Sequence, residues 1–186
     1  MTELIFKAIE FAAKAHRSQY RKGTLLPYIF HPLEVGKILL EAGCSEQIVA
    51  AGILHDTLED TSAKYEDLVN NFGPVVADLV IGTSEPDKKD TWENRKLHTI
   101  NWLKTAPINV LLIAAADKLS NFQTTKDDLS RYGDVIWKKF NRGKEQQRWY
   151  MQSLAEIFWS RIDDNDCRTA IFEEVGKVVK KISALS

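Results

Sequence analysis

The hexapeptide at residues 55–60, HDTLED, constrains the fold of this chain more than any other segment. It directly follows a run of apolar residues, and it contains one imidazole and three carboxylates. If the segment is helical, His55 shares a face with Glu59 and Asp56 shares a face with Asp60, because residues four apart are neighbours on a helix. Carboxylates this close repel one another, and burying them unpaired is costly. A divalent cation removes this conflict, so the hexapeptide predicts a metal site with spare carboxylates that can activate water.

Apolar residues recur at intervals of three and four along most of the chain, as they do on one face of a helix. The apolar run at 110–116 could also be a buried strand, but helix is favoured because no partner strands appear elsewhere. We therefore predict an all-α fold, a helical bundle of about nine to ten helices. The first expected helix ends near 16–20, the second covers 32–43, and the third runs from 45 into the hexapeptide. Further helices are expected at 65–71, 74–84 and 91–105, from 107 onward, and at 132–140, 144–161 and 167–185.

Length and composition restrict the class of protein. With 186 residues, 44% of them hydrophobic and 27% charged, the chain is expected to form one domain with a substantial core. The net charge of −1 gives no argument for a nucleic acid or membrane partner. Cys44 and Cys167 are far apart and lack CxxC spacing, which favours free thiols in a reducing cytoplasm. Glu3 and Glu10 interrupt the apolar pattern near the N-terminus, so we expect neither a signal peptide nor a membrane span there.

Four residues are candidate metal ligands. Asp117 follows the apolar run, so it should emerge at the edge of a buried helix, where a salt bridge with a nearby Lys or Arg is the alternative. His31 lies between apolar neighbours at a helix start and, taken alone, could be a hydrogen-bonded core residue. Together, His31, His55, Asp56 and Asp117 form a nitrogen and oxygen set that suits manganese, iron or zinc better than magnesium or calcium.

Catalytic and substrate-binding candidates surround this set. Glu59 and Asp60 would lie one helical turn beyond the hexapeptide ligands, placed to orient or deprotonate a water molecule. Basic and amide side chains near the motifs could hold phosphates or a base. These substrate-binding candidates are Arg21, Lys22, Lys118, Asn121, Arg142 and Lys144. Arg95 and Lys96 could equally form a solvated helix face, and Trp149 and Tyr150 could line a pocket or pack in the core.

Three spaced motifs resemble a known family. They read Arg21-Lys22…Pro27-Tyr28-Ile29-x-His31-Pro32, then His55-Asp56-Thr57-x-Glu59-Asp60-Thr61, then Ala116-Asp117-Lys118-Leu119-x-Asn121. A lone His, then His-Asp, then a distant Asp is the pattern of the HD metal-dependent phosphohydrolase superfamily. The longer match resembles the hydrolase domain of RelA/SpoT-type alarmone enzymes. With no synthetase domain present, the chain looks like a stand-alone small alarmone hydrolase.

The resemblance implies an HD-type domain over residues 1–186, with its core at about 4–160 and a C-terminal helix at about 167–185. It implies one Mn²⁺ held by the four candidate ligands, and it implies that Glu59 and Asp60 activate the attacking water. Arg21 and Lys22 match a loop that contacts guanine and phosphates, and Asn121 matches an asparagine near the ribose. The implied reaction removes pyrophosphate from the 3′ position of (p)ppGpp in the cytoplasm. A homo-oligomer is possible.

The chain departs from the family pattern at two places. The loop at 21–27 reads RKGTLLP and is longer than the usual type, and the residues after Asn121 lack the commoner arginine. Phosphate contacts could therefore move onto Lys118, Arg142 or Lys144. The alternatives that stay open are an HD hydrolase of an adenine alarmone, of the 2′-phosphate of NADPH or of a nucleotide monophosphate, and a non-catalytic nucleotide-binding sensor.

Overall fold

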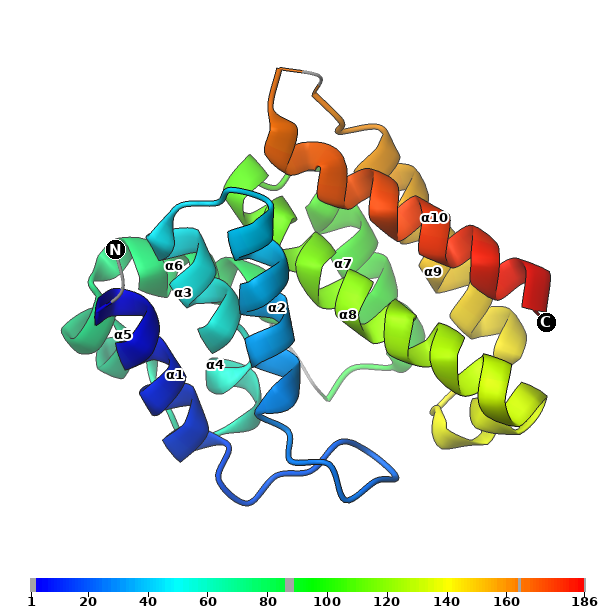
Figure 1. The fold of residues 1–186 in the computed structure, drawn as a ribbon, viewed down its shortest axis with the longest axis horizontal. Coiled ribbons are helices and arrows are strands. Elements are labelled where there is room, and N and C mark those ends of the chain that lie inside the picture. Colours follow the sequence, from blue (N-terminus) through cyan, green and yellow to red (C-terminus); the bar gives the residue numbers. More distant parts are fainter. Residues whose placement is uncertain (1–2, 86–88, 164, 186) are drawn as a thin grey trace.

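A computed structural model describes residues 3–85, 89–163 and 165–185, and these residues form helices and no strands (Figure 1). The all-α prediction is confirmed. The helices are α1 (Glu3–Ala15), α2 (Phe30–Glu41), α3 (Glu46–Leu54), α4 (Thr57–Asp60), α5 (Tyr65–Phe72), α6 (Pro74–Thr83), α7 (Trp92–Thr105), α8 (Ile108–Tyr132), α9 (Lys144–Trp159) and α10 (Ala170–Leu185). Short 3₁₀-helices cover Gly133–Lys139 and Cys167–Thr169. No helix in the described ranges has both the length and the apolarity to cross a membrane.

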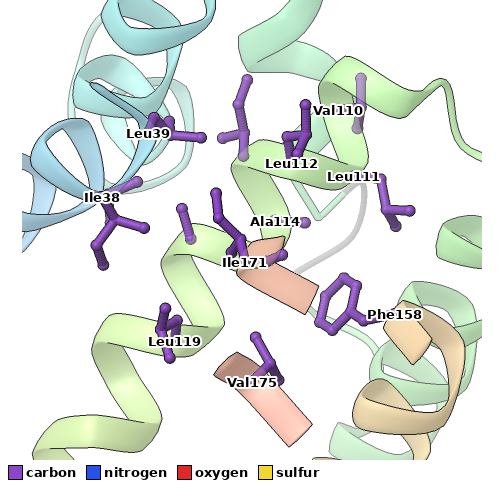
Figure 2. Packing of buried hydrophobic residues seen from close by; sticks show 14 of the residues in the cluster. Ile38, Leu39, Val110, Leu111, Leu112, Ala114, Leu119, Phe158, Ile171 and Val175 are labelled. Carbon is purple, nitrogen blue, oxygen red and sulfur yellow. The ribbon is translucent and has the colours of Figure 1, made fainter. Parts of the chain in front are cut away.

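The long helix α8 organises the core. Its apolar run at 110–116 is buried along its whole length, which confirms helix over strand for this segment. Helices α2, α3 and α6 pack against α8, and α10 lies along it as well. Figure 2 shows Leu112 and Ala114 of α8 in a cluster with Leu39 of α2, Phe158 of α9 and Ile171 of α10. Because α8 is buried before Asp117, that carboxylate emerges inside the molecule.

Glycine, proline and a threonine cap define helix boundaries as the sequence indicates. Gly73 has a φ of +80°, a conformation that favours glycine, and it separates α5 from Pro74, the first residue of α6. The Thr91 side chain accepts a hydrogen bond of 3.2 Å from the backbone N–H of Asn94 and so caps α7.

The structure corrects the predicted continuous helix through the hexapeptide. Helix α3 ends at Leu54, and α4 begins only at Thr57. Two side chains accompany this break: His55 Nδ1 bonds to the carbonyl of Gly52 at 2.8 Å, and the Thr57 hydroxyl donates to the carbonyl of Leu54 at 2.6 Å. Side chains that bond locally to the backbone compete with the helical pattern. The segment at 133–139 is also helical, but of the 3₁₀ type.

Candidate metal centre

Three elements bring the candidate metal ligands together. His31 lies in the first turn of α2, His55 lies just after α3, and Asp117 lies at mid-length in α8. One ligand atom from each of these residues lies within 4.8 Å of the others. Asp117 Oδ1 is 3.1 Å from His31 Nε2 and 3.7 Å from His55 Nε2. Asp56 Oδ2 is 2.9 Å from His55 Nε2 and 3.8 Å from His31 Nε2, so the fourth candidate lies beside the group that the other three form.

The outer nitrogens of both histidines are held by the protein. His31 Nδ1 lies 3.2 Å from Ser120 Oγ, and His55 Nδ1 lies 2.8 Å from the carbonyl oxygen of Gly52. These contacts orient both Nε2 atoms toward the centre, as second partners do for metal-bound histidines. The buried His55 Nε2 makes no contact with hydrogen-bond geometry. An imidazole nitrogen that faces two carboxylates without a well-formed hydrogen bond fits a cation that takes nitrogen and oxygen ligands.

Charge coupling within the centre is strong. Burial opposes ionisation of Asp56, but the contact with His55 and the nearby His31 together lower the pKa of this carboxyl group. Burial likewise opposes ionisation of Asp117, but Lys118, His31 and His55 together hold the pKa of this carboxyl group well below its usual range. Burial disfavours the charged form of His55, yet Asp56 and Asp117 raise its pKa to about 9. A divalent cation would replace that proton in balancing the two carboxylates.

Two further contacts tie the carboxylates to their surroundings. The Tyr28 hydroxyl donates a short hydrogen bond to Asp56 Oδ2. The Asn121 side-chain amide donates to Asp117 Oδ1 at 2.6 Å, and Lys118 Nζ lies 2.5 Å from Asp117 Oδ2. The salt-bridge alternative for Asp117 is therefore present, but it uses the oxygen that faces away from the histidines.

A cavity of about 360 Å³ opens onto the metal centre, which we call the acidic cavity. Its lining includes Glu59 and Asp60 together with His55, Asp56 and Asp117. The acid pair therefore reaches the same space as the candidate ligands, although the helix breaks between them. This arrangement can place a water molecule between a cation and a carboxylate base.

A second cavity of about 570 Å³, which we call the basic cavity, adjoins the first. Arg95 and Lys118 line both cavities and so stand where they meet. Cationic and aromatic side chains dominate the basic cavity, which suits a ligand with several phosphates and a planar base. The cations are Arg21, Lys22, Arg95, Lys96, Lys118 and Lys139, and the aromatic residues are Tyr28, Trp92, Phe122, Phe140 and Tyr150.

A chain of hydrogen bonds links the basic cavity to the metal centre. Arg21 Nη2 donates to Asn121 Oδ1 at 2.8 Å, and Asn121 in turn donates to Asp117. The Arg21 guanidinium also lies 5.9 Å from the centre of the Tyr28 ring. The loop and α8 candidates therefore converge in space, 100 residues apart in sequence. Lys22 lies on the same cavity wall and donates to Asn141 at 3.0 Å.

The structure does not bring all predicted substrate contacts into these cavities. Arg142 pairs with Glu93 at 2.6 Å and Lys144 pairs with Asp134 at 2.8 Å, and neither residue lines the acidic or the basic cavity. The expectation that phosphate contacts shift onto these two residues finds no support in the geometry.

For several other residues that line the cavities, the sequence pattern indicated no role or left two roles open. Arg95 and Lys96 face the cavities, and Glu85 holds both through contacts of 2.5 and 2.6 Å. Tyr150 lines the basic cavity, whereas Trp149 does not appear among its lining residues. No sequence motif marks Lys139. It lines the cavity because the 3₁₀-helix Gly133–Lys139 packs against α8.

Comparison with known proteins gives consistent matches. An HD domain family model matches residues 8–144. The guanosine-3′,5′-bis(diphosphate) 3′-pyrophosphohydrolase of Aquifex aeolicus is 41% identical over 124 residues, covering 66% of this chain and 18% of that protein. The probable chloroplastic GTP diphosphokinase RSH3 of Arabidopsis thaliana is 40% identical over 130 residues with the same coverage. The chain thus spans 18% of the length of each of these curated relatives.

Two solved structures are similar over most of their length. The Listeria monocytogenes protein lmo0812 superposes with a TM-score of 0.75 at 38% identity, over 81% of this chain and 96% of that chain. A metazoan SpoT orthologue, described as hydrolysing ppGpp, also has a TM-score of 0.75, at 28% identity, over 95% of this chain and 96% of that chain.

Proposed function

The chain belongs to the HD domain family, and from this premise we propose that it is a metal-dependent phosphohydrolase that removes pyrophosphate from the 3′ position of (p)ppGpp. The descriptions of the Aquifex aeolicus relative and of the metazoan SpoT orthologue support this choice of substrate. The proposal covers the hydrolase activity alone.

One observation carries the proposal: an acidic cavity with a candidate metal centre adjoins a cavity lined by six cations and five aromatic residues. A nucleotide that bears phosphates at both its 3′ and its 5′ positions needs cations around it and a surface on which its base can stack. The scissile 3′ group must at the same time reach the metal centre. Adjoining cavities that share Arg95 and Lys118 suit such a ligand.

We propose that His31, His55, Asp56 and Asp117 hold one divalent ion, with Mn²⁺ as first choice and Fe²⁺ or Zn²⁺ as alternatives. The grouping of His31, His55 and Asp117, with Asp56 beside it, supports this assignment, and so does the lack of a well-formed hydrogen bond at His55 Nε2. When bound, such an ion supplies Lewis-acid chemistry, polarising a phosphate and lowering the pKa of water.

In this proposal the acid pair and the basic residues have separate roles. Glu59 and Asp60 orient the water and accept its proton. The water oxygen bonds to the inner phosphorus of the 3′-diphosphate, the bond from that phosphorus to the 3′ oxygen breaks, and the 3′ oxygen takes up a proton. Arg95 and Lys118 neutralise the phosphates at the junction of the cavities. The products are pyrophosphate and GDP or GTP.

We also propose that residues 1–186 form one HD-type domain, with its core at about 4–160 and a C-terminal helix at about 167–185. The packing of α10 against α8 and α9 supports a single domain. A cytoplasmic location and a small-molecule nucleotide as substrate, with neither a nucleic acid nor a membrane as partner, are part of the same proposal.

The test is to incubate the purified chain with Mn²⁺ and ppGpp and to identify the products by anion-exchange chromatography. We expect GDP and pyrophosphate, with no product when Asp117→Ala replaces the wild type. An adenine alarmone, NADPH and nucleotide monophosphates are tested in separate parallel reactions as alternative substrates. Tight ppGpp binding without any product would overturn the proposal in favour of a nucleotide-binding sensor.

A further inference from the structure

The end of the basic cavity away from the metal centre contains a carboxylate, a lysine and an aromatic ring of its own. Asp117, Asn121, Thr124 and Asp128 follow one another along α8 at spacings of four, three and four, which places them on one face of the helix. Eleven residues of helix correspond to about 16 Å along its axis. A nucleotide that lies along this face of α8 with its 3′ phosphate near Asp117 would bring its base toward Asp128.

Asp128 is the single carboxylate among the described residues that line the basic cavity. It forms a short ion pair with Lys139, and the side chains of the two residues are 31% and 32% exposed. Lys139 Nζ also lies 5.4 Å from the centre of the Phe140 ring, and Phe140 lines the same cavity. An acid, a base and an aromatic ring thus meet at this end of the cavity.

We propose that Asp128 and Lys139 read the edge of a guanine base in the basic cavity, an inference that rests on the proposed function. An ionised aspartate only accepts hydrogen bonds, and a lysine ammonium only donates them. Side by side, they present one donor and two acceptor oxygens. Guanine presents the complementary row, an acceptor at O6 followed by donors at N1 and N2, so the base replaces the direct contact between the two side chains with contacts to each.

Adenine does not fit the same row. It places a donor at N6, where guanine has an acceptor, and an acceptor at N1, where guanine has a donor. Lys139 would then face a donor, and Asp128 would face a lone pair at N1. Sites that hydrogen-bond a substrate group discriminate strongly against analogues that lack it, because the polar groups of the site lose their partners. The pair therefore selects guanine over adenine.

An ordinary surface ion pair is the competing explanation for these two side chains. A pair exposed to about this extent contributes little to stability, so its removal should leave folding nearly unchanged. Binding selectivity is then the property that separates the two explanations. The chain also offers a matched control on the same helix, since Asp127 is 60% exposed, contacts Lys126 at 3.1 Å and does not line the cavity.

The first experiment measures binding of GDP, IDP and ADP to the Mn²⁺-loaded protein by isothermal titration calorimetry. Inosine lacks the 2-amino group of guanine, so GDP should bind more tightly than IDP and IDP more tightly than ADP. We expect about a 10-fold loss for each hydrogen bond to a charged group that is removed. Equal binding of GDP and ADP by the wild type would overturn the inference.

The second experiment uses variants at the pair. Asp128→Asn should reduce the ratio of GDP to ADP affinity by about 10-fold or more, because an amide can pair with adenine. Lys139→Met should weaken GDP and IDP but not ADP. Asp127→Asn should keep the wild-type ratio. An Asp128→Asn ratio equal to that of Asp127→Asn would overturn the inference.

Hydrolysis assays separate this inference from the proposed function. If ppGpp and its adenine counterpart are hydrolysed with equal kcat/KM, the proposed hydrolase activity stands and the base-reading pair is refuted. If neither is hydrolysed but GDP still binds more tightly than ADP in an Asp128-dependent way, the hydrolase proposal fails and the base-reading pair is supported.

Discussion

Replacing Ser120 with alanine removes one hydrogen bond behind the metal centre and leaves every proposed ligand in place. Ser120 is buried on α8, and its hydroxyl lies 3.2 Å from His31 Nδ1. That hydroxyl orients the imidazole so that Nε2 faces the centre. Without it the ring can turn, and its outer nitrogen loses a buried partner.

The expected loss of metal affinity follows from this geometry. Loss of such an outer partner typically lowers metal affinity or activity by about 10- to 100-fold. A contact of 3.2 Å lies at the long end of the usual hydrogen-bond range, so we expect the lower end of that interval. Ser120→Ala should therefore weaken Mn²⁺ binding about 10-fold, which corresponds to about 1.4 kcal/mol.

The assay is titration of metal-free protein with Mn²⁺, followed by the electron paramagnetic resonance signal of the free ion. Ser130→Ala is the matched control, because Ser130 lies on the same helix and its exposed hydroxyl donates only to the carbonyl of Lys126 at 2.9 Å. Equal Mn²⁺ affinity in the two variants would refute the assigned role of Ser120 and the placement of His31 as a ligand supported from behind.

Three other changes test the centre and the core. Glu59→Gln should keep Mn²⁺ bound but slow ppGpp turnover by ~10²-fold or more, because it removes a proton acceptor. Relative to Gly176→Ala, Gly52→Ala should lower the free energy of unfolding by about 1–3 kcal/mol, because a Cβ there would lie 2.3 Å from Leu39 Cδ1 in a closely packed core. Chelating the metal should lower the thermal midpoint, since an ion at 100 times its Kd stabilises the native state by about 2.7 kcal/mol. For a chain of this length that is a shift of about 5–11 °C.

Each of these expectations has its own contrary outcome. Full turnover in a Glu59→Gln, Asp60→Asn double variant would remove the acid pair from the mechanism. Gly176→Ala on α10 is the control for Gly52→Ala, because a Cβ there meets nothing within 4 Å, and alanine should raise stability by about 0.5–1 kcal/mol. Equal effects of the two glycine changes in urea denaturation would contradict the packing argument. If the thermal midpoint changes neither when EDTA is added nor when Mn²⁺ is then restored, metal binding by the native state is contradicted.

The predicted helices agree with the structure where local chemistry decides the backbone. Apolar spacing, the proline at 74 and the threonine cap at 91 act within one or two turns, and the boundaries of α6 and α7 follow them closely. The helix break before Thr57 was not predicted, because it accompanies side-chain bonds to Leu54 and Gly52 that the residue pattern does not reveal. Type and order of the helices were accessible, whereas this interruption was not.

By itself, the sequence determined the all-α fold and the residues that could hold a metal. Histidines and carboxylates beside apolar runs enter the interior with those runs, so the sequence predicts that His31, His55, Asp56 and Asp117 lie inside the molecule. Only the tertiary structure decided which cations face the cavities. A long, flexible side chain pairs with the opposite charge that tertiary packing places near it. Arg142 therefore pairs with Glu93 outside the cavities, while Lys139, which no motif marks, lies beside Asp128 within the basic cavity.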